Sequence, residues 1–289
     1  MNQKDYVNLG QAILEMSQEY FFQESFKHLY PKKSEQELTE FWNKNIPTEA
    51  GSIQDIIKDI EEGFLQGLTG IINPKFMGYI LTRPVPESHL LDTLVNATHA
   101  TPGATHLAMS ATLIERCTIR WIGQETHLTN FNGLYTSCGS ISNLVALKCA
   151  RDKKVNRNRG IQSNIILYVS DETHYSIFRA WDILGCGIDN VRQYQNDNLE
   201  DLKLLIQKDL VKGYVPAAIV CHIGTTNTGK IEALAQIKNI AHEHGLWLHI
   251  DGAYGAAVLL LDEFQHLRKL AKQADSINID LHTWFGMPA

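Results

Sequence analysis

The stretch AAIVCHIGTTNTGKIEALAQIKNIAHEHGLWLHID, residues 217–251, decides the fold class of this chain. It opens with a continuous apolar run, Ala217–Ile223, and closes with another, Leu246–Asp251. Between the two runs, Leu234–His244 carries apolar residues at helical spacing. Two apolar strands joined by a helix predict a parallel strand pair in a sheet that helices cover on both faces.

The same alternation continues on both sides of this unit. Ile165–Ser170 and Ser276–Asp280 are further short apolar strands, and Ala111–Gly123 and Ser140–Arg151 have helical periodicity. The sequence therefore predicts an α/β fold with a mostly parallel sheet. Ligands bind such sheets at the carboxyl ends of the strands.

The N-terminal part has a different pattern. Residues 1–72 are predicted to form a helical segment, and residues 73–289 a large domain. Ser52 and Asp55 resemble a capping box at the start of an amphipathic helix. Residues 73–110 are rich in Pro, Gly, Thr and His, which predicts loops and turns.

Composition excludes several functional classes. The net charge of −6 and the pI of about 6.0 leave no basic surface for nucleic acid or anionic lipid. The five cysteines form no CxxC pair, so neither a disulfide framework nor a metal site is expected. No apolar run approaches the ~18 residues of a membrane span, and the polar N-terminus favours a cytoplasmic protein. The basic stretch Arg151–Arg159 is interpreted as a solvated turn.

Two features could bind an anion and a cation. Gly139 and Ser140 precede a helical run, where free backbone N–H groups and the helix dipole favour an anion such as phosphate. Asp251 closes a buried strand, where a protonated pyridine nitrogen would be a suitable partner. Taken singly, a Gly-Ser pair is more often a turn and a cap, and Asp251 could cap a turn with Gly252.

Two further features lie beyond strand ends. His174 follows Ile165–Ser170 and could stack on an aromatic ring, although a lone histidine more often has a structural role. Thr226 follows Ala217–Ile223, and threonines in turns usually bond only the backbone. Because each feature follows a strand or begins a helix, the four together predict one shared cleft.

These segments resemble the group II pyridoxal-phosphate (PLP)-dependent decarboxylases, which act on aromatic amino acids, glutamate, histidine and tyrosine. The resemblance is carried by Cys221–Gly229, Leu248–Gly255 and Ala274–His282. Tyr135–Leu147 resembles the phosphate-loop signature of that family, and Asn73–Tyr79 its early substrate-side loop. The resemblance extends from about residue 50 to the end.

The resemblance implies an aspartate-aminotransferase-like large domain (PLP fold type I), an amino-acid substrate and an obligate homodimer. It implies that Gly139 and Ser140 hold the phosphate with His282 beside them. It implies further roles for four residues, in which His174 stacks on the ring, Thr226 lies close to it, Asp251 pairs with the ring nitrogen and Tyr79 lines the substrate side. The sphingosine-phosphate lyases share this fold, which leaves another carbon–carbon cleavage open.

Three positions depart from the family pattern. Gly252 replaces a usual alanine, Leu281 a usual proline, and Thr283 the Schiff-base lysine. A hydroxyl cannot form the Schiff base, so noncovalent PLP and an inactive decarboxylase are expected, and the alternative is a non-catalytic pseudoenzyme kept for binding or interaction. Natural loss and engineering both stay open as origins of Thr283. The resemblance also implies that a C-terminal small domain is missing after Ala289.

Overall fold

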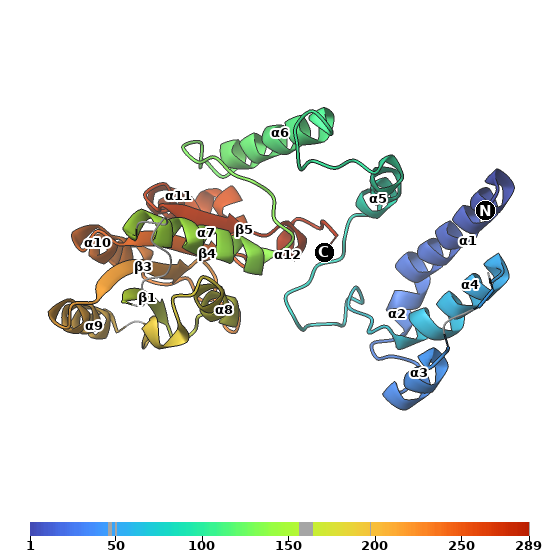
Figure 1. The fold of residues 1–289 in the computed structure, drawn as a ribbon, viewed down its shortest axis with the longest axis horizontal. Coiled ribbons are helices and arrows are strands. Elements are labelled where there is room, and N and C mark those ends of the chain that lie inside the picture. Colours follow the sequence, from blue (N-terminus) through green and yellow to red (C-terminus); the bar gives the residue numbers. More distant parts are fainter. Residues whose placement is uncertain (46–47, 50, 156–163, 197, 289) are drawn as a thin grey trace. The chain divides into compact units, whose positions relative to one another are not determined.

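The structure is a computed structural model that describes residues 1–45, 48–49, 51–155, 164–196 and 198–288. The chain divides into two compact units, Met1–Pro84 and Val85–Ala289. Figure 1 labels most of the helices and strands of both units. In the described part of the chain, no helix combines the length and the apolar character needed to cross a bilayer.

The first unit is built of helices, as the sequence predicts. α1 (Gln3–Glu19) packs against α4 (Ile53–Asp59), and α3 (Glu35–Trp42) packs against the π-helical turn Ile60–Phe64. A second π-helical turn and the short α2 (Ser25–Lys27) follow α1.

Capping boxes begin two of these helices. Ser52 and Asp55 exchange side-chain and backbone hydrogen bonds at the start of α4, which confirms the predicted cap. Ser34 and Glu37 do the same at α3. Each box satisfies N–H groups that the first helical turn leaves without partners.

The second unit contains a five-stranded sheet in which every neighbouring pair is parallel. The strand order is β2-β1-β3-β4-β5. The strands are β1 (Ile165–Ser170), β2 (Val191–Tyr194), β3 (Val215–His222), β4 (Trp247–Gly252) and β5 (Ser276–Ile279). The direction of winding reverses between β1 and β3, and at such a point the carboxyl ends of the strands open a crevice.

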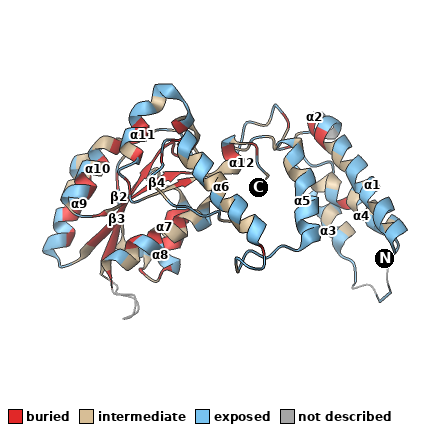
Figure 2. Ribbon diagram, turned by 90° about the horizontal axis from the view of Figure 1, so that it is seen from above, coloured by how far each residue is buried: buried red, intermediate tan, exposed pale blue. Residues whose placement is uncertain are grey.

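Helices cover both faces of this sheet, which confirms the predicted α/β architecture. One core lies under two helices, α7 (Gly139–Lys154) and α8 (Tyr175–Ile183). The other lies under α9 (Leu199–Val211), α10 (Leu234–Glu243) and α11 (Gln265–Ala271). Figure 2 shows the buried strands between these layers.

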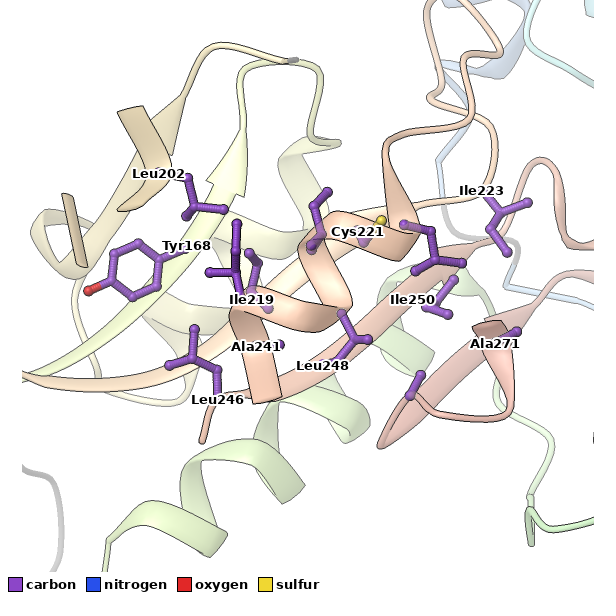
Figure 3. Close-up of a cluster of buried hydrophobic side chains, with 14 of the residues drawn as sticks. Tyr168, Leu202, Ile219, Cys221, Ile223, Ala241, Leu246, Leu248, Ile250 and Ala271 are labelled. Carbon is purple, nitrogen blue, oxygen red and sulfur yellow. The ribbon is translucent and has the colours of Figure 1, made fainter. Parts of the chain in front are cut away.

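Figure 3 shows the second core, in which Leu202 of α9 and Ala241 of α10 meet Ile219 of β3. All six residues of β1 are buried. Burial on both faces explains the continuous apolar runs of the sequence, since each buried aliphatic side chain contributes about 1.5–3 kcal/mol.

The loop prediction is wrong over part of residues 73–110, because Pro86–Thr98 forms helix α5. Pro86 takes the first helical position, where its fixed φ is favourable and its missing N–H has no role. Helix α6 (Met109–Glu125) follows, close to its predicted bounds. The basic stretch that starts at Arg151 belongs to α7 as far as Lys154, and residues 156–163 lie outside the described residues.

Candidate functional site

Asp251 lies near the carboxyl end of β4 and is 6% exposed. The side-chain amide of Asn143 donates to its Oδ2 at 2.9 Å, and the backbone N–H of Ala253 donates to its Oδ1 at 3.1 Å. Burial raises the pKa of Asp251, but the charges of His222 and His249 outweigh burial. Together with these two hydrogen bonds, they hold the pKa of Asp251 below its usual range. Among the described residues, no lysine or arginine forms an ion pair with this carboxylate. Its negative charge is therefore available to a cationic ligand.

Asn143 of α7 is the centre of a buried polar network. Its Nδ2 donates to Asp251 and also to Oγ of Ser176 at 3.1 Å. Its Oδ1 accepts from Nδ2 of Asn278 at 2.6 Å and from Nε2 of His249 at 3.0 Å. Every hydrogen-bonding position of the amide is used, so the amide has one orientation and fixes the carboxylate beside it.

His249 positions Asn143 as a neutral ring. Because Oδ1 of Asn143 can only accept, Nε2 of His249 carries the proton, and Nδ1 accepts from the hydroxyl of Ser276 at 2.9 Å. Nε1 of Trp247 donates to the same hydroxyl at 2.7 Å. Burial lowers the pKa of His249 to about 4. At neutral pH this ring therefore adds no positive charge next to Asp251.

His174 joins the same network from the start of α8. Its Nδ1 accepts from the backbone N–H of Ser176 at 3.3 Å and lies 2.8 Å from the hydroxyl of that residue. Since Ser176 also accepts from Asn143, a chain of hydrogen bonds runs from His174 to Asp251. Burial lowers the pKa of His174, which favours the neutral ring.

The N-terminus of α7 lies next to this network. No side chain caps the helix. In its first turn, the backbone N–H groups of Ile141 and Ser142 donate to the carbonyl oxygen of Cys138. In the described part of the chain this leaves the N–H groups of Gly139 and Ser140 free, at the positive end of the helix dipole. A Cβ on Gly139 would lie 3.4 Å from Cβ of Ala253, so the helix start packs against the loop that follows Asp251. A helix start with free N–H groups, which could bind an anion, therefore lies next to the loop that follows the buried carboxylate.

A cavity of about 580 Å³ opens beside this helix start. Gly139, Asn278 and His282 line it, together with apolar residues of α6. His282 therefore shares a cavity with Gly139, and its role beside a phosphate stays a prediction. Asp251 and His174 are not among its walls, so the cavity borders the anion-binding end of the site and not the carboxylate.

Glycines let the loops after β3 and β4 pack closely. Gly224 has a φ of +85°. A Cβ on Gly255 would lie 2.2 Å from the carbonyl oxygen of Ile223, and one on Gly252 would lie 2.6 Å from Cβ of Ala256. The glycine at 252 is therefore required by this packing, because an alanine side chain would have no space there.

Three further predicted site residues differ in location and exposure. Thr226 is exposed on the loop after β3. Thr283 is 6% exposed in α12 (Leu281–Trp284), directly after His282. Tyr79 belongs to the first unit, is 86% exposed and has a φ of 61°. Its substrate-side role stays a prediction.

His222 and Glu232 form a buried ion pair beside the network. Oε2 of Glu232 accepts from Nδ1 of His222 at 3.0 Å and from its backbone N–H at 2.7 Å, and the two side chains are 3% and 1% exposed. Burial lowers the pKa of His222, but Glu232 and the nearby charges of Asp251 and Glu172 outweigh burial and raise it. The ring is therefore charged more readily than an ordinary histidine.

The site matches a ligand that carries an anionic group at one end and a cationic ring nitrogen at the other. Pyridoxal 5′-phosphate has this pair of groups. The family model described as pyridoxal-dependent decarboxylase conserved domain matches residues 35–289. The chain belongs to the pyridoxal-dependent decarboxylase family.

Curated relatives agree with this assignment. The aromatic-L-amino-acid decarboxylase of Bacillus atrophaeus is 28% identical over 254 residues, which are 85% of this chain and 52% of that relative. The 4-hydroxyphenylacetaldehyde synthase of Rhodiola rosea is 30% identical over 258 residues, 82% of this chain and 52% of that protein. The chain thus spans about half the length of these two relatives.

Solved structures have the same fold. Mouse CSAD matches with a TM-score of 0.91 at 23% identity, over 98% of this chain and 63% of that one. Oryza sativa TDC, solved with PLP and tryptamine, matches with a TM-score of 0.88 at 22% identity, over 99% and 65%. These matches confirm the predicted aspartate-aminotransferase-like fold, and pyridoxal 5′-phosphate is the cofactor of this decarboxylase family.

Sequence reasoning missed most of the buried network, including Asn143, Asn278, His249 and Ser176, and it missed the ion pair of His222 and Glu232 beside it. Asn143 and Asn278 interrupt an apolar helix and an apolar strand, and His222 interrupts the apolar run of β3. A polar residue inside a buried run is the signal that could have found them. Glu232 offers no comparable signal, because its hydrogen-bond partner, His222, lies ten residues earlier in the chain.

Proposed function

We propose that this chain is the cofactor-binding domain of an amino-acid decarboxylase, in which Asp251 pairs with the protonated ring nitrogen of pyridoxal 5′-phosphate. The environment of Asp251 carries the proposal. The carboxylate is 6% exposed, is kept ionised by nearby histidine charge together with amide and backbone donors, and has no lysine or arginine partner among the described residues. A pyridinium nitrogen supplies the missing cation, and the carboxylate raises the pKa of that nitrogen.

The start of α7 is proposed to bind the phosphate. Its free N–H groups at Gly139 and Ser140 and its dipole favour a dianion. The hydroxyl of Ser140 adds a donor, and His282 borders the same cavity as Gly139. Charge complementarity at both ends of the cofactor then fixes its direction in the site.

His174 and Thr226 are proposed to contact the ring between these ends. Ser176 fixes the orientation of the His174 imidazole, and burial favours its neutral form, which suits stacking on a cationic ring. Thr226 is exposed on the neighbouring loop and is free to approach a ligand. Tyr79 is proposed to line the substrate side.

The bound cofactor supplies an electron sink for loss of the α-carboxylate of an L-amino acid. Asp251 contributes by holding a proton at the ring nitrogen. Asn143 and the N–H of Ala253 keep the carboxylate in place, with His249 fixing Asn143 from behind. The protein thus provides orientation and charge, and the cofactor provides the chemistry.

Thr283 supports noncovalent binding and loss of catalysis in this chain. A hydroxyl cannot attach the cofactor aldehyde as an amine does, and it cannot carry the proton that a lysine transfers, a contribution worth roughly 10²–10⁴-fold. The chain as it stands is therefore proposed to be inactive as a decarboxylase. A pseudoenzyme kept as a binding protein is the second candidate, and the same residue favours it.

A homodimer is proposed from the apolar surface of α5 and α6. Neither helix has a buried residue. Yet both expose large apolar side chains, namely Leu90, Leu91, Leu94 and Val95 on α5, and Leu113, Ile114 and Trp121 on α6. A second copy of the chain would cover this surface. Sedimentation equilibrium should give a dimer that Leu94→Glu dissociates, and a wild-type monomer would refute it.

The test of cofactor binding uses the wild-type chain and its Thr283→Lys variant. Pyridoxal 5′-phosphate is added to each, the mixture is treated with borohydride, and the tryptic peptides are analysed by mass spectrometry. We expect the cofactor to bind the wild type and to be removed by dialysis after reduction. We expect the Thr283→Lys variant to carry the reduced cofactor at position 283.

Two results would contradict the proposal. Stoichiometric reduction onto a lysine of the wild-type chain would show that Thr283 does not prevent attachment. Labelling of the Thr283→Lys variant only at surface lysines would show that position 283 does not face the cofactor.

A further inference from the structure

His222 is the buried titratable group that the proposed function leaves unused. It ends β3 and is the register partner of Asp251 on β4. Register partners on adjacent strands project their side chains from the same face of the sheet. Asn278 of β5 is the register partner of Asp251 on the other side. Three polar side chains therefore form a row across β3, β4 and β5 at the carboxyl edge.

Glu232 fixes the ring of His222. A carboxylate can only accept hydrogen bonds, so the contact of 3.0 Å between Oε2 of Glu232 and Nδ1 of His222 places a proton on Nδ1. The same oxygen accepts the backbone N–H of His222 at 2.7 Å. Both side chains are almost fully buried, so water does not screen the pair.

The second nitrogen of His222 is unused. Its Nε2 is buried and has no hydrogen-bond partner among the described residues. The titratable groups near the ring are Glu232, Asp251, Glu172, His174 and His249. The three acids favour a charged ring, while burial keeps the two other histidines neutral. The surroundings of His222 thus favour an imidazolium with one free N–H.

We propose that His222 is a positioning residue for Asp251, and that its imidazolium, held by Glu232, shares the negative charge of Asp251 with the ring nitrogen of the bound cofactor. The inference rests on the proposed role of Asp251. His222 keeps Asp251 ionised before a ligand arrives. It also lowers the pKa of the bound ring nitrogen relative to a site in which that carboxylate stands alone. The neutral His249 on the same face has no such effect.

The probe for this role is pyridoxine 5′-phosphate, which has the ring and the phosphate but no aldehyde. It cannot attach to surface lysines, and its absorption spectrum changes when the ring nitrogen loses its proton. The bound probe is titrated with base on the wild type, on His222→Gln and on His266→Gln, a matched substitution at an exposed histidine of α11.

Removal of the imidazolium should make the ring nitrogen hold its proton more tightly. We expect His222→Gln to raise the pH of proton loss by about one unit, a tenfold change in proton affinity. Glu232→Gln should shift it in the same direction by less, because it removes the support of the imidazolium together with one negative charge. His266→Gln should leave it unchanged.

A second measurement needs neither ligand nor variant. In the ligand-free wild type with ¹⁵N-labelled histidines, the resonances of His222 should show both ring nitrogens protonated at pH 7. A neutral His222 at pH 7 would overturn the inference, even if His222→Gln does not fold.

The outcomes separate the two proposals. If the probe binds the wild type but its ring proton is lost at the same pH in His222→Gln, the role of His222 is wrong and that of Asp251 stands. If the probe does not bind the wild type at all, both proposals fail.

Discussion

Two buried aspartates of the same domain have opposite surroundings. Asp209 of α9 is 3% exposed, and the guanidinium of Arg192 donates to both of its oxygens at 3.1 Å, while the hydroxyl of Tyr168 donates at 3.0 Å. Asp251 is almost as buried, but it receives only the amide of Asn143 and a backbone N–H.

The comparison separates a structural carboxylate, Asp209, from Asp251, which is proposed to bind a ligand. The chain neutralises Asp209 with its own arginine, in a bidentate geometry that is complete without a ligand. The chain holds Asp251 ionised at the carboxyl edge of the sheet and supplies no lysine or arginine from its described residues. A buried carboxylate at a strand end with neutral donors is therefore the better indicator of a site.

The largest expected effect on stability comes from Asp209→Asn. This change leaves the guanidinium of Arg192 without its anion, and loss of one partner of a buried pair costs about 3–5 kcal/mol. Because the side chain of Arg192 is 21% exposed, we expect the lower end, about 3 kcal/mol, in urea unfolding. Affinity for pyridoxine 5′-phosphate should change less than twofold. A stability loss under 1 kcal/mol would contradict the structural role of Asp209.

A smaller effect is expected from the buried neutral histidine on the Asp251 side. The pKa of His249 is about 4 in the folded chain and 6.5 in the reference state, so the unfolded chain binds more protons between these values. Stability should therefore fall by about 2 kcal/mol from this group as the pH drops from 7 to 5.

The check is urea unfolding at both pH values. His249→Gln should lose about 2 kcal/mol less than the wild type over this range, because it has no ring to protonate. Equal pH dependence in the two chains would show that His249 is not held neutral.

The smallest expected effects come from one hydroxyl on each side. Ser176→Ala removes an acceptor of Asn143, and Tyr168→Phe removes a donor to Asp209. Each should cost about 1 kcal/mol of stability in urea. Only Ser176→Ala should also weaken binding of pyridoxine 5′-phosphate, by several-fold, since Asn143 fixes Asp251. Equal weakening of binding by Tyr168→Phe would contradict the view that only the Asp251 side affects the ligand.

The core of the fold could be predicted because burial on both faces leaves a local signal. The apolar runs of β1, β3, β4 and β5 lie within two residues of their observed bounds. β2 (Val191–Tyr194) has no such signal, since it is a four-residue edge strand with Arg192 and Gln193 in its centre. α5 is hidden by the prolines before it.

The candidate site could be predicted only in part from the sequence. Asp251 stands out because a charge closes an apolar strand, and Gly139 because a glycine precedes a helix. The bond from Asn143 to Asp251 joins residues 108 positions apart, and no local pattern encodes such a contact. The same limit hides Asp209, which looks like an ordinary polar residue of a helix.

The most direct test measures the affinity of pyridoxine 5′-phosphate for the wild type, Asp251→Asn and Asp209→Asn by calorimetry. We expect Asp251→Asn to weaken binding about 100-fold, since it removes a charge-assisted hydrogen bond to the ring nitrogen, and Asp209→Asn to change binding less than twofold. Equal weakening by both substitutions, or none by Asp251→Asn, would contradict the claim that Asp251 is the partner of a cationic ring.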